Sequence, residues 1–201
     1  TIARLFSEGK YDASRIISLC GSEVKKPRYY RTISGTCVSN LIEDNVEENN
    51  NRVICGDVLS GTKIEKNGYL GFYDTQLTVI KEGNEQEFFG WALPGFNKFS
   101  MSKSYFSWLF PNRKYEIDTN MRGEERAYVV TGQYEKVLPM DIFPQQLIKA
   151  IMIEDIDLME KLGLYEVGPE DLALCEFVCT SKIEVQSIIR HGLDILRKEN
   201  L

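Results

Sequence analysis

The chain has 201 residues, of which 43% are hydrophobic and 27% charged, and its net charge at pH 7 is −6. This composition is typical of a globular protein with one large domain or two small ones. The acidic balance, without a basic stripe, argues against nucleic-acid binding and predicts that an anionic membrane repels the chain, so that membrane association would come only through partners.

Residues 15–80 are predicted to be rich in β-structure. Residues 16–20 (IISLC) form a short apolar run that Gly21 closes, as expected of a buried strand. Residues 28–33 (RYYRTI) follow Pro27, are rich in aromatic and β-branched residues, and end near Gly35. The short polar turn between the two runs predicts a hairpin.

A brief helix is predicted next, with Thr36 as its cap and Val38, Leu41 and Ile42 at helical spacing. Residues 52–55 (RVIC) and 77–80 (LTVI) read as two further strands, and the glycine-bearing residues 56–61 (GDVLSG) read as a tight turn rather than a phosphate cradle. The order strand, strand, helix, strand, strand is that of a β-grasp, in which one helix lies across a small mixed sheet.

Residues 90–111 are aromatic and irregular in pattern. The side chains that could contact a ligand or a partner are Trp91, Phe96, Phe99, Tyr105 and Trp108. Aromatic residues at this density fill the seam between two lobes, or they form a platform on which a planar ring such as a quinone stacks. The sequence favours packing and leaves the second interpretation open.

Beyond Pro139 the pattern becomes helical. Pro144 suits the first turn of a helix, and Asp155 can cap the next one, with Leu158 and Met159 facing inward. Ser181 starts a capping box before the last helix, which predicts an all-helical C-terminal lobe.

Few residues suggest chemistry. His191 is the only histidine, no nucleophile elbow or nucleotide-binding loop is present, and no run approaches the ~20 apolar residues of a membrane-spanning helix. We therefore expect no catalytic residue, no cofactor and no metal. Cys175 and Cys179 are spaced as one helical turn, but two thiols are half of what an iron–sulfur cubane needs. An odd cysteine count predicts a reducing, cytoplasmic compartment.

Four segments carry a resemblance to a known family. They are residues 52–61 (RVICGDVLSG), 87–99 (EFFGWALPGFNKF), 123–127 (GEERA) and 171–179 (DLALCEFVC). Together they resemble the A subunit of the Na⁺-translocating NADH:quinone reductase, and the likeness runs over nearly the whole chain. That family is similar to the C subunit of the Rnf electron-transport complex and to the NADH-oxidising subunit of respiratory complex I.

The Rnf relative carries two C-x2-C-x2-C-x3-C-P runs that hold two 4Fe–4S clusters. Aligned on Pro139, the first run places its ligand positions on residues without thiols: Tyr128, Thr131, Tyr134 and Leu138. The second run places its positions on Pro169, Leu172, Cys175 and Cys179. The resemblance therefore implies a ferredoxin-like lobe without iron–sulfur clusters, in which Cys175 and Cys179 are remnants.

The resemblance also implies an α+β fold in four parts. Residues 1–14 would be the tail of a preceding Rossmann-like domain, 15–85 a β-grasp domain of the soluble-ligand-binding (SLBB) type, 86–136 an aromatic-rich connection, and 137–201 the helical domain. The first residue, Thr1, is consistent with a piece of a longer protein.

The implied function is that of a peripheral subunit on the cytoplasmic side of the bacterial inner membrane. It would serve as a scaffold in a respiratory-chain translocase that passes electrons from NADH to ubiquinone and exports sodium, without independent activity. Flavins and an iron–sulfur centre are expected in other subunits, and the implied partners are the membrane-embedded B subunit and the C subunit. The alternative is a quinone- or other ligand-binding module in the same complex.

Overall fold

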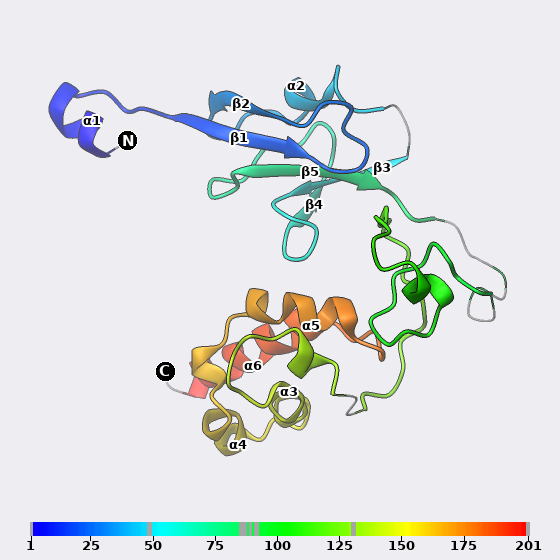
Figure 1. Cartoon of the computed structure of the whole chain (residues 1–201). Helices are drawn as coiled ribbons and strands as arrows, with labels where there is room; N and C mark the ends of the chain where they lie inside the picture. The colour runs from blue at the N-terminus through cyan, green and yellow to red at the C-terminus, as the bar shows by residue number, and fades with distance from the viewer. Residues whose placement is uncertain are drawn as a thin grey trace. The chain divides into compact units, whose positions relative to one another are not determined.

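The computed structural model describes residues 2–47, 50–84, 88, 90, 93–129 and 132–199 (Figure 1). It is a mixed α+β protein with one five-stranded sheet and several helices, as the sequence predicts at that level. The chain divides into two compact units, one formed by residues 1–86 with 116–120 and the other by residues 87–115 with 121–201. The finer four-part division remains a prediction.

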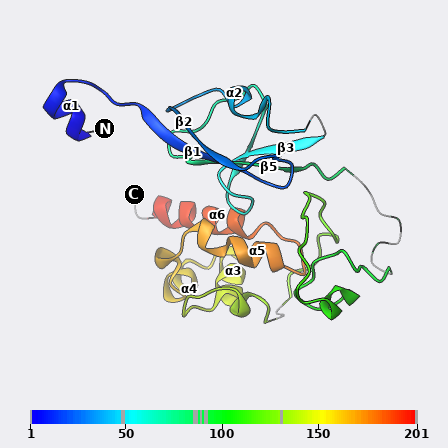
Figure 2. The same ribbon diagram turned by 45° about the horizontal axis from the view of Figure 1, so that its top comes forward.

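The first unit contains the sheet, whose strands are β1 (Ser14–Cys20), β2 (Arg28–Ile33), β3 (Asn51–Cys55), β4 (Thr62–Ile64) and β5 (Gln76–Lys81). Their order across the sheet is β2-β1-β5-β3-β4, and β1 pairs with β5 in parallel while the other pairs are antiparallel (Figure 2). The predicted hairpin is confirmed, because β1 pairs with β2 along its length. The edge strand β4 was not predicted.

One face of the sheet is covered by a short helix, α2 (Ser39–Ile42), as the helical spacing predicts (Figure 2). The predicted cap is wrong, because Val38 rather than Thr36 is the N-cap and no side chain caps the helix. Side chains alternate along β1, so that Ile17 and Leu19 enter the core while their neighbours face outward. Gly21 ends β1 at a φ of 124°, and a Cβ there would overlap the carbonyl oxygen of Val79 in β5. Only glycine fits that turn.

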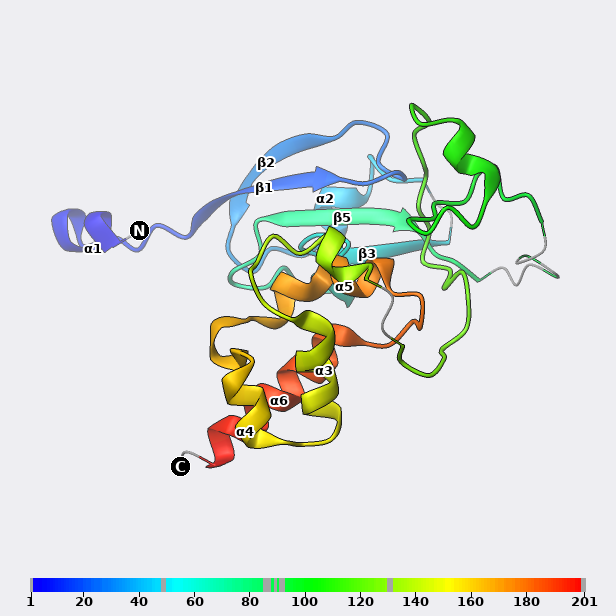
Figure 3. The same ribbon diagram turned by 60° about the horizontal axis from the view of Figure 1, so that its bottom comes forward.

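A helix that was not predicted, α1 (Ile2–Glu8), precedes the sheet and has no buried residue (Figure 3). Arg4 pairs with Glu8 within the helix at 3.3 Å and with Asp12 in the following chain at 2.8 Å. Its apolar side chains therefore lie outside the core of the first unit.

The second unit is built around four helices: α3 (Pro144–Met152), α4 (Ile156–Lys161), α5 (Ala173–Val178) and α6 (Val185–Glu199) (Figure 3). Short 3-10 turns precede α3, at Phe106–Leu109 and Tyr134–Lys136, and lie between α4 and α5, at Leu164–Glu166 and Pro169–Leu172. Pro144 occupies the first turn of α3, and the Asp155 carboxylate accepts from the Leu158 amide at 3.0 Å, as predicted. Within the described part of the chain, no helix is both long and apolar enough to cross a bilayer.

Two local predictions in this unit are wrong. Leu158 is 37% exposed, and only Met159 of that pair is buried. The capping box also fails, since α6 begins at Val185 and the Ser181 hydroxyl donates to the carbonyl of Ala127 instead. The amide of Gln186 near the start of α6 donates to the Glu176 carboxylate at 2.8 Å, so the cap comes from α5.

Candidate functional site

The positions that align with iron–sulfur ligands lie in the core of the helical unit. Tyr134, Leu138, Leu172, Cys175 and Cys179 belong to one cluster of buried side chains, and each is 8% exposed or less. Tyr134 and Leu138 lie in or just after the 3-10 turn before α3, whereas the other three lie more than thirty residues later, in or next to α5. Thr131 lies outside the described residues. Two positions remain: Tyr128 is partly buried against this cluster, and Pro169 begins the 3-10 turn before α5 and is itself buried.

Tyr134 and Cys179 are in direct contact. The Tyr134 hydroxyl donates to the Cys179 Sγ at 3.0 Å, and both side chains are 2% exposed. The ring of Tyr128 packs on the ring of Tyr134, with centroids 6.0 Å apart and planes inclined at 32°. Burial raises the pKa of both phenols well above the ordinary value, so both stay protonated.

Cys175 lies in α5, one turn before Cys179, and both thiols are free. The sequence places the two on one helix, whereas α5 ends at Val178 and Cys179 leaves it with an extended ψ of 120°. Both side chains are fully buried. Burial, reinforced by the nearby Glu135 carboxylate, raises the pKa of the Cys175 thiol to about 11. It is therefore a protonated thiol and a poor nucleophile at neutral pH.

This arrangement does not fit an iron–sulfur cluster. A 4Fe–4S cluster is held by four thiolates, and only Cys175 and Cys179 carry sulfur among the aligned positions. Leu138 and Leu172 supply no ligand atom, and the phenols of Tyr128 and Tyr134 are hard oxygen donors. Among the described residues, no three histidine, cysteine, aspartate or glutamate side chains gather as metal ligands would. The chemistry that these residues do provide is that of a packed core.

A second candidate region is the aromatic loop, which we define as residues 93–115. Phe96, Phe99 and Trp108 are each 42–50% exposed, and Tyr105 is half-buried beside the ammonium of Lys98, which lies 5.3 Å from its ring centroid. Phe99 also packs on Phe177 of α5, with ring centroids 5.4 Å apart. Trp91, the fifth predicted contact residue, lies outside the described residues.

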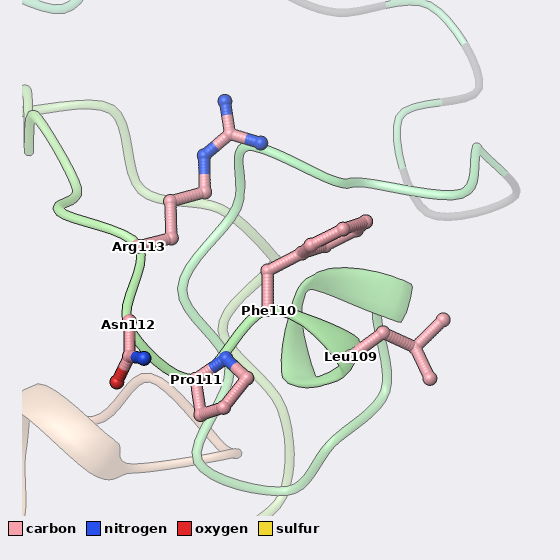
Figure 4. Close-up of a pocket in the computed structure, with 5 residues that line it drawn as sticks. All are labelled: Leu109, Phe110, Pro111, Asn112 and Arg113. Carbon is pink, nitrogen blue, oxygen red and sulfur yellow. The ribbon is translucent and has the colours of Figure 1, made fainter.

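A shallow hollow opens on the aromatic loop. It has a volume of about 470 Å³ and is lined by Leu109, Phe110, Pro111, Asn112 and Arg113 (Figure 4). The Leu109 and Phe110 side chains and the Arg113 guanidinium extend from the same short stretch of backbone. None of these five lining residues was among the contacts that the sequence predicted, although Trp108 directly precedes them in the chain.

The sequence did not single out a polar network in the first unit. The Glu82 carboxylate pairs with the guanidinium of Arg52 and with the ammonium of Lys63, and it accepts from the Thr119 hydroxyl at 2.9 Å. These bonds, led by that from Arg52, lower the pKa of Glu82 to about 2. Arg52 lies in β3, Lys63 in β4 and Glu82 directly after β5, so the network ties these strands together. The same three side chains also line an open hollow of about 880 Å³.

His191 is an exposed residue, as expected for an isolated helical histidine. Its Nε2 lies 3.3 Å from a carboxylate oxygen of Glu154, and both side chains are more than half exposed. No nucleophile contacts this imidazole in the described part of the chain.

Comparison with known proteins places these features in context. Residues 16–66 match a family model described as the NQRA C-terminal domain (NQRA_SLBB). Over 98% of its length the chain is 43% identical to the A subunit of the Na(+)-translocating NADH-quinone reductase of Rhodopirellula baltica and to that of Pasteurella multocida. It is 44% identical to the corresponding protein of Haemophilus influenzae. The chain spans 44% of the length of each of these relatives.

Proposed function

The chain belongs to the sequence family of the A subunit of the Na⁺-translocating NADH-quinone reductase, and on that premise we propose that it is a structural part of such a complex without a cofactor of its own. The two units would be a β-grasp of the soluble-ligand-binding type and a ferredoxin-like helical lobe. The contact between Tyr134 and Cys179 carries this proposal.

The geometry of that contact agrees with a ferredoxin origin. In two-cluster ferredoxins the fourth cysteine of each run binds the cluster of the other run. Tyr134 aligns with the third position of the first run and Cys179 with the fourth position of the second, so the two would share one cluster. Their side chains touch at 3.0 Å although 45 residues separate them. Leu138 and Leu172, which pair in the same crossed way at the other cluster, share the same core.

The lobe keeps its stability because side chains fill the space that a cluster would occupy. Leu172 and Tyr134 are 0% and 2% exposed, and burial of a side chain of this size contributes roughly 1.5–3 kcal/mol. A structural role follows, in which this chain supplies a rigid surface for its partners. We propose that it does so as a peripheral component on the cytoplasmic side of the inner membrane, docked to the membrane-embedded B subunit and to the C subunit. The electron carriers would lie elsewhere in the complex.

The docking role can be tested by pull-down. Tagged chain should retain the B subunit, from a detergent extract that contains the rest of the complex, in near-stoichiometric amount. Deleting residues 181–201 would remove Ile189 and Leu196 from the core and unfold the lobe, so that loss of binding would not report on docking. A charge reversal at an exposed residue, such as Glu170→Lys in the turn before α5, leaves the core intact and tests whether this surface contacts the partner. A folded wild-type chain that retains neither the B nor the C subunit would refute the docking role.

A second candidate function is quinone binding by the aromatic loop. It is supported by the hollow beside Phe110, whose apolar lining and nearby Arg113 suit a flat ring with carbonyl oxygens. Titration with a soluble quinone in a Trp91→Phe variant would report on Trp108 alone, because the chain has two tryptophans. Saturable quenching that Phe110→Ala weakens would support this function, and linear, non-saturating quenching would exclude it.

A further inference from the structure

The charge of the chain is unevenly distributed. Within the aromatic loop, residues 93–115, there are four basic residues and no acidic residue. The net charge of −6 therefore consists of +4 on the loop and −10 on the remainder. The overall acidity that argued against membrane contact thus conceals one locally basic segment.

The loop also exposes large apolar side chains. Phe106, Trp108, Leu109 and Phe110 follow one another closely in the sequence, and each is 50–53% exposed. The ring of Phe96 lies 6.2 Å from that of Phe106 and 6.3 Å from that of Phe110, which holds the three rings in one exposed cluster. Large apolar patches on a surface mark a place where something binds.

This exposure coexists with an organised backbone. The Phe106 amide donates to the Pro94 carbonyl at 2.9 Å, and the buried Ser107 hydroxyl donates to the Lys98 carbonyl at 2.6 Å. Lys98 itself is buried and donates to the Gly90 carbonyl at 2.8 Å. Ser107 and Lys98 thus point inward and fix the path of the loop, while the rings of Phe96, Phe106 and Phe110 remain exposed.

The aromatic loop also carries basic side chains on its surface. Lys103, Arg113 and Lys114 are exposed, and in the part of the chain that the structure describes none of them forms an ion pair. Arg113 extends from the backbone segment that also carries Phe110 (Figure 4). Tryptophan and tyrosine concentrate at the interface between bilayer and water, and each lysine or arginine near an anionic surface contributes roughly 1 kcal/mol.

We propose that the aromatic loop binds the interfacial region of an anionic phospholipid bilayer. Trp108 and Phe110 enter the boundary between headgroups and acyl chains, while Arg113 and Lys114 pair with lipid phosphates. At physiological ionic strength charges act over roughly 8 Å, so acidic residues farther away than that are largely screened. Glu116, two residues after Lys114, is close enough to offset part of the attraction. The inference does not depend on the proposed scaffold role, since it uses only the composition and exposure of the loop.

The test is flotation of the full chain with vesicles of phosphatidylcholine alone and of phosphatidylcholine mixed with phosphatidylglycerol. We expect partition into the anionic vesicles only, with loss of binding in high salt. The variant Arg113→Gln/Lys114→Gln should bind roughly 30-fold more weakly, from about 1 kcal/mol for each charge. The matched control Lys25→Gln/Lys26→Gln removes the same charge from an exposed pair of lysines in the first unit and should bind like the wild type.

Insertion is tested separately from attraction. In a Trp91→Phe background, Trp108 emission should shift to shorter wavelength with anionic vesicles, and lipids brominated on the acyl chain should quench it. Absence of flotation with anionic vesicles would overturn the proposal and leave a protein partner as the occupant of the patch. Equal binding by the Arg113→Gln/Lys114→Gln variant would overturn it as well, because the basic residues would then contribute nothing.

Discussion

Replacing Tyr134 by phenylalanine removes one buried hydroxyl and leaves the ring in place. The lost bond to Cys179 should lower the free energy of unfolding by about 1 kcal/mol, since a neutral hydrogen bond contributes roughly 0.5–1.5 kcal/mol and sulfur is a weak acceptor. Replacing Tyr134 by alanine also removes the ring from a side chain that is 2% exposed. By analogy with other aromatic-to-alanine changes in cores, that variant should lose roughly 3–5 kcal/mol.

The assay is urea unfolding followed by circular dichroism at 222 nm, which reports chiefly on the helical unit. Tyr165→Phe is the matched control, because its hydroxyl donates to Glu160 at 2.8 Å on the exposed surface of the same unit. It should change stability by less than ~0.5 kcal/mol. If Tyr134→Ala were no less stable than Tyr134→Phe, the ring would not be filling a core, and the account of the lobe as a packed remnant would be refuted.

Three further predictions concern other sites. The pKa of Glu82 is about 2 in the folded state, below its ordinary value, so the ionised carboxylate stabilises the fold above about pH 4.5 and this stabilisation is lost as pH falls toward 2. Between these limits the free energy of unfolding of the wild type should fall by ~1–3 kcal/mol more than that of Glu82→Gln. Parallel curves of stability against pH for the two proteins would contradict this. In native protein a thiol reagent should modify Cys37, because the Ser39 hydroxyl and nearby backbone amides lower the pKa of its thiol. The reagent should reach Cys175 only on unfolding, and labelling of Cys175 in native protein, seen by mass spectrometry, would contradict its burial in the core. Gly21→Ala should destabilise the first unit by several kcal/mol, whereas Gly35→Ala, which has a positive φ but open space around it, should cost only about 1 kcal/mol; equal melting temperatures would argue against the close approach to β5.

Much of the sheet could be predicted because local composition and burial agree. The runs at 16–20, 28–33, 52–55 and 77–80 are β-branched and apolar, and all four became strands. The edge strand β4 has only three residues, none of them buried, so no pattern marks it. The helix α1 escaped prediction for the same reason, because it buries nothing and thus leaves no core stripe in the sequence.

Tertiary contacts decided the remaining outcomes. The capping box at Ser181 failed because its hydroxyl bonds to a carbonyl 54 residues away, which no local pattern encodes. The contact between Tyr134 and Cys179 joins residues 45 apart, and only the alignment with cluster-binding runs brought both positions into view. The exposed rings of the aromatic loop could be located from sequence, but their exposure could not, since dense aromatic residues fill cores as readily as they form surface patches.

The central claim is that side chains in this lobe fill the positions where a ferredoxin would bind iron and sulfur. The most direct measurement is the iron and acid-labile sulfide content of the full chain, after anaerobic purification and after incubation with ferrous iron and sulfide under strong reductant. We predict neither element above trace level and no absorption near 400 nm, with Cys175 and Cys179 still protected from alkylation. Stoichiometric iron and sulfide that coelute with folded protein would contradict the account.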